Sequence, residues 1–236
     1  MSGSTNTCAA WPMAVSQQSV SAKIAVSGTY DGELKRFVGA GALGSGGQAE
    51  GQDPLFELAP GAVLKNVILG APAADGVHCK GSCTLENVWW EDVGEDAATL
   101  KGGDASQVMT ITCGGARHAS DKVFQHNGPG TMRIEHFQVE DFGKLYRSCG
   151  NCSDQYARHV EFSDIEARGG GALAGINTNY EDTAKFENIT VHDPKMKLKI
   201  CDHYTGNDQG DEPSKTGTGP DATHCLYEES AIRWVD

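Results

Sequence analysis

The chain has 236 residues, of which 30 are glycine, 7% are aromatic and eight are cysteine, and its formal net charge at pH 7 is −13. Many glycines beside few aromatic residues indicate short strands joined by tight turns, and they argue against a helical bundle. The negative charge argues against nucleic acid as a partner. No apolar run approaches the roughly 20 residues of a membrane span, so we expect no membrane partner.

The N-terminal segment has neither the basic start nor the apolar stretch that would identify a signal peptide. We therefore expect the printed sequence to be a mature form with an added or residual Met1, from which a signal peptide has been removed upstream. An even number of cysteines favours an oxidising compartment. The expected location is extracellular, and an acidic, glycine-rich chain of this kind is most simply a monomer.

The cysteine spacing suggests four disulfide bonds. Short loops suggest two of them, proximity near the C-terminus suggests a third, and the two remaining cysteines are left for each other. The pairs are Cys79 with Cys83, Cys149 with Cys152, Cys201 with Cys225, and Cys8 with Cys113. Zinc is the alternative for the two short pairs, but the long interval between them fits no conventional zinc ribbon.

A repeated apolar segment with a central Asn runs through the chain. Its strongest copies are residues 64–67 (LKNV), 85–88 (LENV) and 186–189 (FENI), and weaker copies surround residues 110, 136 and 164. The six marks 66, 87, 110, 136, 164 and 188 lie 21, 23, 26, 28 and 24 residues apart. This period, with alternating apolar residues and no helical pattern, predicts an all-β, disulfide-stabilised, right-handed parallel β-helix.

The recurrent Asn predicts a ladder of buried amides that bond from coil to coil. A simple preference of Asn for turns is the alternative, but it explains one copy better than a series. We expect one domain over residues 1–236, with a core of roughly 20–200 and a loop-rich tail of 201–236. Within the tail, residues 202–221 are polar and predict a long loop.

Acidic residues recur at one place in the repeat. Asp75 is nine residues past the mark at 66 and Asp96 is nine past the mark at 87, so stacking would place them on adjacent coils about 5 Å apart. With Glu95 beside them they would repel one another unless a cation is bound, and an all-oxygen site suits Ca²⁺. A solvated acidic face is the alternative.

Basic residues follow in the next coils. Lys122 lies 12 residues past the mark at 110, and Lys144 and Arg147 lie 8 and 11 past the mark at 136. Each alone is more simply a solubilising surface charge, but together they predict a groove in which cations continue the acidic cluster. Such a groove would hold a polyanion despite the net charge of the chain.

Residues 54–152 resemble pectate lyases of polysaccharide lyase family three, notably the fungal and oomycete-like branch. Four runs carry the resemblance: LKNVILGAPAADGVHC at 64–79, ENVWWEDVGEDA at 86–97, DKVFQHNG at 121–128 and DFGKLYRSCGNC at 141–152. The resemblance implies secretion, calcium dependence and β-elimination of α-1,4-polygalacturonate to 4,5-unsaturated oligogalacturonates. It places the metal carboxylates on Asp75, Glu95 and Asp96, the catalytic cations on Lys122, Lys144 and Arg147, and a further groove carboxylate on Glu50.

For the mechanism we expect Lys122 to remove the C5 proton, Arg147 to stabilise the charge that develops on the uronate, and Lys144 to bind substrate. An Arg is a poor neutral base because its pKa lies above 12, but the roles of Lys122 and Arg147 could be reversed. Two other functions stay open. One is hydrolysis by paired Asp residues, as in a polygalacturonase, and the other is pectin or cell-wall binding without catalysis.

Overall fold

The computed structural model describes residues 8, 10–49 and 51–236, and its regular structure is almost entirely β-strand. The strands are β1 (Gln17–Val20), β2 (Ile24–Val26), β3 (Thr29–Gly39), β4 (Phe56–Leu58), β5 (Ala62–Leu69), β6 (Val77–Cys79), β7 (Cys83–Trp90), β8 (Ala98–Leu100), β9 (Val108–His126), β10 (Gly130–Ser148), β11 (Arg158–Asn177), β12 (Thr183–His192), β13 (Lys199–Thr205), β14 (Ser214–Thr218), β15 (Cys225–Leu226) and β16 (Ile232–Val235). In the described part of the chain, the helical segments are the short 3₁₀ turns η1 (Gly41–Leu43), η2 (Thr178–Tyr180) and η3 (Glu229–Ala231). The predicted all-β class is confirmed.

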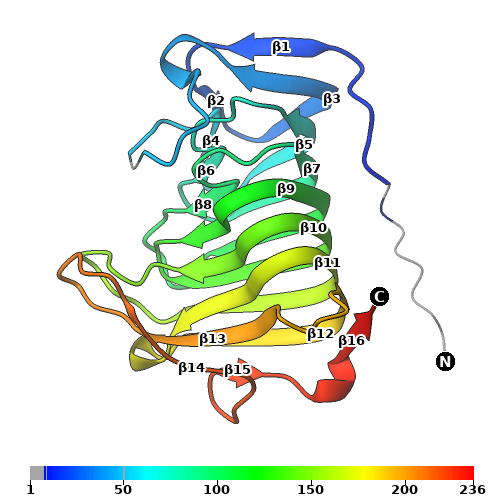
Figure 1. Cartoon of the computed structure of the whole chain (residues 1–236). Coiled ribbons are helices and arrows are strands. Elements are labelled where there is room, and N and C mark those ends of the chain that lie inside the picture. Colours follow the sequence, from blue (N-terminus) through cyan, green and yellow to red (C-terminus); the bar gives the residue numbers. More distant parts are fainter. Residues whose placement is uncertain (1–7, 9, 50) are drawn as a thin grey trace.

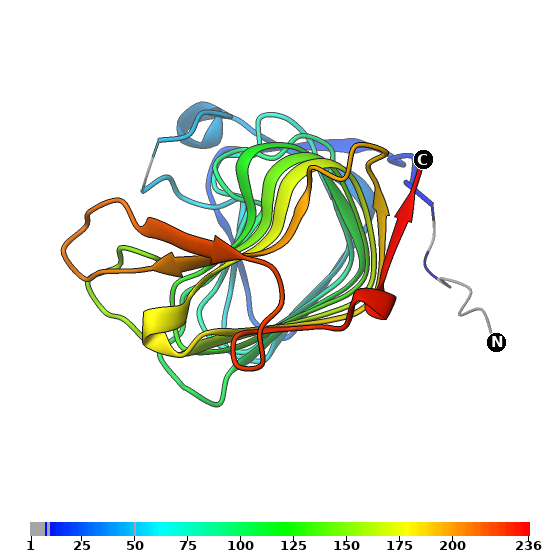
Figure 2. The ribbon, with the colours of Figure 1, turned by 60° about the horizontal axis from the view of Figure 1, so that its bottom comes forward.

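Successive coils pair in parallel. One row of strands has the order β1-β3-β5-β7-β9-β10-β11-β12-β15, and a second row, β2-β4-β6-β8, also joins β9. Strand β9 is long because it continues around a corner, pairing with β7 over its first part and with β8 at its end. Figure 1 shows the coils stacked along one axis, and Figure 2 shows them nearly superposed. The predicted parallel β-helix is confirmed.

The core is a set of apolar columns inside this stack. In one column the register aligns a residue from each of six coils, and all six are buried: Leu64, Leu85, Ile111, Ile134, Phe162 and Phe186. Alternate residues of each strand point inward, so the same position in every coil supplies the core. The rings of Phe162 and Phe186 stack with centroids 4.8 Å apart.

A column of left-handed backbone positions marks one corner of the stack. Its members with positive φ are Asn66, Asn87, Cys113, His136, Asp164 and Asn188. Their side chains bond from coil to coil: Asn66 Nδ2 donates to Asp31 Oδ1 at 2.9 Å and Asn87 Nδ2 donates to Asn66 Oδ1 at 2.8 Å. Further along, Asn188 Nδ2 donates to Asp164 Oδ1. The structure therefore contains the amide ladder that the repeat predicts, with Asp and His at some positions.

Two expectations about the ladder are wrong. The register pairs Glu86 with Thr112 and Trp89 with Gly115, so Cys113 rather than residue 110 follows Asn87 in the column. The ladder is also not buried, because its amides lie along the outer side of the corner. Asn66 and Asn87 are half-buried, and Asn188 is exposed.

The four disulfide bonds join the predicted pairs. The tail, expected as a long loop, instead forms a partly stranded hairpin. In it β13 pairs in parallel with β11 and antiparallel with β14, and the hairpin projects from the stack at the left of Figure 1. Over residues 8, 10–49 and 51–236, no helix has the length and apolar character needed to cross a membrane.

Candidate active site

Three carboxylates meet on one face of the stack. Strands β6 and β8 pair Val77 with Ala98, and two residues before each of these come Asp75 and Asp96. Glu95 lies beside them, and one carboxylate oxygen from each of the three residues lies within 4.8 Å of the others. All three side chains are buried, at 3 to 5% exposure. The structure thus brings the three predicted metal carboxylates together.

Burial and mutual repulsion make this acidic cluster costly without a cation. Burial, followed by the charges of Asp96 and Asp75, raises the pKa of Glu95 to about 8. Burial also raises the pKa of Asp96 to about 7, although Lys122 opposes the shift. Two buried oxygens, Asp75 Oδ1 and Asp96 Oδ1, have no hydrogen-bond partner among the described residues.

An oxygen-binding cation fits this cluster. A buried acceptor without a partner costs about 1 to 3 kcal/mol. A bound cation would remove that cost for Asp75 Oδ1 and would add to the ion pair that Asp96 Oδ1 makes with Lys122 Nζ at 3.5 Å. The donors are all carboxylate oxygens, which suits Ca²⁺ and disfavours metals that select nitrogen or sulfur. The chemistry of the residues present therefore fits the calcium that the sequence predicts.

Asp75 is held by residues that the sequence analysis missed. Its Oδ2 lies 2.6 Å from His78 Nε2 and 4.0 Å from Lys101 Nζ. His78 is itself buried, at 5% exposure. The signal that could have identified His78 is its place three residues after Asp75, in the middle of the short strand β6. Metal carboxylates are commonly oriented by such neighbours.

Lys122 joins the acidic cluster to the cations. The register pairs Ala98 with Phe124, so Lys122 follows Asp75 and Asp96 in the same column. Its Nζ lies 3.6 Å from Glu95 Oε1, 3.5 Å from Asp96 Oδ1 and 2.8 Å from Asp121 Oδ2. Burial alone would lower the pKa of Lys122, but these carboxylates outweigh it and raise the pKa. Counted from Cys113 instead of 110, Lys122 is nine residues past its mark, as the two Asp residues are past theirs.

Lys144 and Arg147 extend this row in the next coil. The register pairs Lys144 with Lys122, and Arg147 with Gln125. A cavity of about 190 Å³ lies between them, and among its lining residues are Lys122, Gln125, Lys144, Arg147, Tyr204 and Glu212. A smaller hollow of about 60 Å³ over the carboxylates shares Lys122 and Gln125 with it. The carboxylates and the cations therefore line one continuous groove.

Arg147 is fixed within the wall of this groove. Its guanidinium carbon lies 4.1 Å from the centroid of the Tyr204 ring, and its Nη1 donates to Gly175 O at 3.2 Å and to Asn177 Oδ1 at 3.0 Å. Burial lowers the pKa of Arg147. Tyr204 and Asn177 were not predicted from the sequence, because they come from later strands that no local pattern relates to Arg147.

One predicted site residue cannot be placed. Glu50 lies outside the described residues. The neighbouring Gly51 lines the small hollow over the carboxylates.

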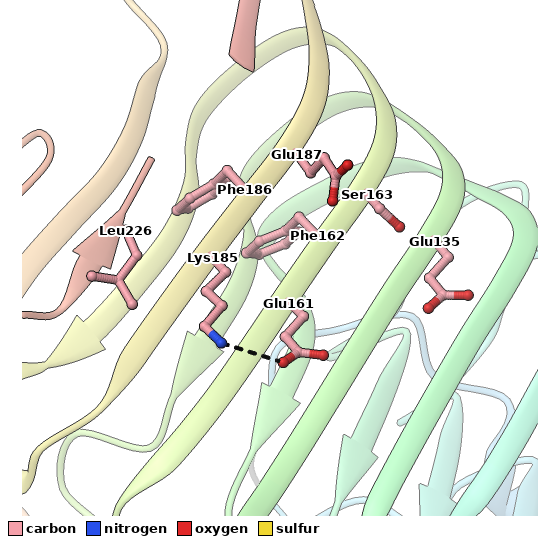
Figure 3. Close-up of a pocket in the computed structure, with 8 residues that line it drawn as sticks. All are labelled: Glu135, Glu161, Phe162, Ser163, Lys185, Phe186, Glu187 and Leu226. Carbon is pink, nitrogen blue, oxygen red and sulfur yellow. Dashed lines mark ion pairs between the residues drawn. The ribbon is translucent and has the colours of Figure 1, made fainter. Parts of the chain in front are cut away.

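A wider hollow lies on a different face. It has a volume of about 600 Å³ and lies over β10, β11 and β12, with Leu226 of β15 at its edge (Figure 3). Its lysine, Lys185, lies 3.9 Å from Glu161 Oε1, and Glu135 and Glu187 add negative charge. A polyanion would meet repulsion there, so we place the site in the smaller, cation-lined groove.

Comparisons with known proteins place the chain in a family. A family model described as "Pectate lyase" matches residues 8–211. "Probable pectate lyase E" of Neosartorya fischeri is 50% identical over 94% of this chain and 86% of its own length, and "Pectate lyase E" of Emericella nidulans is 47% identical over the same shares. The crystal structure of the catalytic domain of pectate lyase PelI from Erwinia chrysanthemi has a TM-score of 0.78 and 31% identity, and the match covers 94% of this chain and 98% of that one. PelI in complex with tetragalacturonic acid matches with a TM-score of 0.76 and 30% identity, over 92% of this chain and 70% of that one. This chain therefore belongs to the pectate lyase family of enzymes.

Proposed function

We propose that the chain is a secreted, calcium-dependent pectate lyase that cleaves α-1,4-polygalacturonate by β-elimination and acts as a monomer. The observation that supports it most is the single column in which buried carboxylates are followed by Lys122 and Lys144 in consecutive coils. The related PelI was crystallised with tetragalacturonic acid, an oligomer of the proposed substrate. Four disulfide bonds favour an oxidising compartment outside the cell.

Asp75, Glu95 and Asp96 would hold the calcium. When bound, calcium supplies positive charge that acidifies the proton next to the uronate carboxylate and offsets the carboxylates that keep Lys122 protonated. Lys144 Nζ and the guanidinium of Arg147 bind carboxylates of the polymer directly. Arg147 presents several N–H donors in a fixed plane, which suits a two-point contact with a carboxylate.

In the proposed reaction, Lys122 Nζ takes the proton from C5 of the uronate. The electrons of the C5–H bond form the C4–C5 double bond, and the C4–O bond breaks. The departing oxygen takes a proton from solvent water, so one chain receives a hydroxyl group and the other an unsaturated end, and Lys122 later returns its proton to solvent. Arg147 stabilises the negative charge that builds up on the carboxylate as the proton leaves.

The reversed assignment, with Arg147 as base, has one observation in its favour. Lys122 is ion-paired with three carboxylates, while burial lowers the pKa of Arg147. The pH dependence of kcat separates the two assignments. If Lys122 is the base, replacing it by Arg should shift the ascending limb of the profile, in which the base loses its proton, to higher pH, whereas Arg147→Lys should lower kcat without moving that limb.

The decisive test follows the ultraviolet absorbance of unsaturated uronates while the protein acts on polygalacturonate, with calcium and then with excess chelator. We expect an absorbance rise that the chelator abolishes. New reducing ends without a rise would indicate hydrolysis, and binding with neither signal would indicate a pectin-binding protein; both results would overturn the proposal.

A further inference from the structure

The guanidinium of Arg147 is held from behind by a buried amide. Asn177 Oδ1 accepts a hydrogen bond from Arg147 Nη1 at 3.0 Å. Asn177 has 0% exposure, so its side chain cannot reach a substrate. Among the described residues, Nε and Nη2 of Arg147 have no hydrogen-bond partner, and these donors remain available to a carboxylate in the groove. The amide therefore occupies one side of the guanidinium and leaves the other side free.

Asn177 is itself fixed by a closed set of hydrogen bonds. Its Nδ2 donates to Ser148 Oγ and to Cys149 O, both at 3.0 Å. Ser148 Oγ donates to Asp182 Oδ2 at 2.5 Å, and the backbone N–H of Asn177 donates to the same oxygen at 2.8 Å. Ser148, Asn177 and Asp182 all have 0% exposure. Buried networks in which every member is satisfied are rigid and specify one geometry.

The backbone around Arg147 leaves little room for another side-chain position. A Cβ atom at Gly175 would lie 2.9 Å from Arg147 Cδ, and one at Gly150 would lie 2.6 Å from Arg147 Nη2. Arg147 therefore lies flat against two glycines, with the ring of Tyr204 4.1 Å from its guanidinium carbon. Two hydrogen bonds from Arg147 Nη1 fix the rotation of the guanidinium within this slot, one to the backbone at Gly175 O and one to the side chain of Asn177.

The amide of Asn177 is uncharged, which suits a hydrogen-bond partner of a cation that has to bind the uronate. A carboxylate bonded directly to the guanidinium would offset the positive charge that has to meet the uronate. Asn177 supplies an oxygen without a charge, and the charged Asp182 lies one hydrogen bond further back. The arrangement holds Arg147 in place and keeps its charge for the substrate.

We propose that Asn177, supported by Ser148 and Asp182, is a positioning residue that sets the orientation of Arg147 for the elimination reaction. The inference rests on the proposed function of Arg147. It predicts that replacing Asn177 lowers kcat, by misplacing Arg147, more than it lowers the stability of the folded chain.

The test is a double-mutant cycle on lyase activity. Asn177→Ala should lower kcat by about tenfold to a hundredfold in the otherwise native enzyme, with little change in KM. In an Arg147→Lys background, the same change should lower kcat by no more than about twofold. Ser148→Ala, a smaller change, should show the same coupling at reduced size, and it keeps the proposal testable if Asn177→Ala does not fold.

Two further measurements separate positioning from a purely structural role. Val191→Ala, a core substitution outside the groove, is the stability control: it should lower the midpoint of thermal unfolding but leave kcat unchanged. The affinity for a galacturonate oligomer, measured in chelator, should stay close to native in both Asn177→Ala and Val191→Ala, because the loss in Asn177→Ala is expected in kcat. Equal losses of kcat in both Arg147 backgrounds, or native kcat in Asn177→Ala, would overturn the inference alone. A native enzyme without lyase activity would overturn the proposed function and the inference with it.

Discussion

Single residues in the groove carry charges that a ligand would balance. Glu95 and Asp96 are buried acids with raised pKa values, and Lys122 is the only cation among the described residues that lies within 4.0 Å of both. Lys101 Nζ adds a more distant contact, 4.0 Å from Asp75 Oδ2, so two amines face three carboxylates. The residues therefore favour binding a further positive charge, and stability and activity should both respond to it.

Calcium-free protein should become less stable as the pH rises from about 5 to about 8. The carboxyl groups of Glu95 and Asp96 keep their protons in the folded state up to pKa values of about 8 and about 7, whereas their ordinary values are 4.5 and 3.8. Above those ordinary values the unfolded chain releases protons that the folded chain retains, so rising pH favours unfolding. Midpoints of thermal unfolding in chelator should fall across this window.

Calcium should abolish that fall, because it binds the deprotonated carboxylates. A Glu95→Gln, Asp96→Asn double variant is the control, and its midpoint should change less with pH when chelator is present. If the midpoint of thermal unfolding in chelator rose between about pH 5 and about pH 8, it would contradict the prediction that ionisation of Glu95 and Asp96 destabilises the calcium-free protein.

Replacement of Lys122 by Ala should lower kcat by about 10²- to 10⁴-fold, as expected for loss of a proton-transferring group. Lys185→Ala, which removes an exposed lysine on another face, should leave kcat unchanged. Initial rates of absorbance increase at several pH values provide the measurement. Near-native turnover of Lys122→Ala at raised pH would rule out Lys122 as the base.

At the scale of elements, the ladder holds the corner of each coil in a left-handed conformation. Asn87 contributes two hydrogen bonds, donating to Asn66 Oδ1 and accepting from Trp89 Nε1 at 2.7 Å. Asn188, near the end of the stack, is exposed and donates only to Asp164 Oδ1 among the described residues. The two positions have nearly the same φ, at 56° and 53°.

Asn87→Ala should therefore cost about 2 to 3 kcal/mol of unfolding free energy, and Asn188→Ala about 1 kcal/mol. Both substitutions place Ala in the same strained backbone region, so the difference between them reports the hydrogen bonds inside the stack. Urea unfolding curves give both values. Equal costs would mean that backbone strain, and not the ladder, sets the stability of the corner.

The repeat could be predicted from the sequence where coils have equal lengths. Asp75 and Asp96 follow marks 21 residues apart, with no insertion between them, so counting placed them correctly in one column. The next coil is longer and its ladder position is occupied by Cys113, which no Asn marks. Counting from residue 110 therefore put Lys122 three residues too far past its mark, at 12 instead of nine. Lys122 nevertheless lies in the same column as Asp75 and Asp96.

Contacts made by the tail could not be predicted in this way. Tyr204 packs on Arg147 because β13 adds to the edge of β11 and then turns back into β14. Such a hairpin has no period in common with the coils. Asn177 likewise ends a strand 30 residues after Arg147, and its role depends on the burial of its side chain, which the local sequence does not reveal.

At the scale of the whole molecule, two kinds of disulfide bond stabilise the stack. Cys8 and Cys113 are 105 residues apart in sequence, whereas Cys79 and Cys83 are only 4 apart. The long bond ties the N-terminal segment to the ladder column, beside the ring of Trp11, which packs 4.8 Å from that of Trp89. The short bond closes one turn.

Replacing the long pair by Ser should cost more than replacing the short pair, because a cross-link restricts the unfolded chain more when it closes a longer loop. Chain entropy gives about 5 kcal/mol for the first and about 2 kcal/mol for the second. Guanidinium unfolding of the Cys8→Ser, Cys113→Ser variant beside the Cys79→Ser, Cys83→Ser variant measures the difference. A larger loss for the short pair would show that local packing outweighs chain entropy.

The shared column of Asp75, Asp96, Lys122 and Lys144 also has a consequence for how such enzymes can diverge. Each coil pairs with the next through parallel strands and aligned core residues. A duplicated coil could therefore be added to the stack without changing how the coils pair. A coil duplicated beyond β11 would lengthen the basic end of the groove and add room for further sugar units. The same duplication between β6 and β8 would move Asp75 and Asp96 from adjacent coils to coils two layers apart and would break up the carboxylate cluster. Natural variation in coil number should therefore accumulate at the ends of the stack and spare its middle.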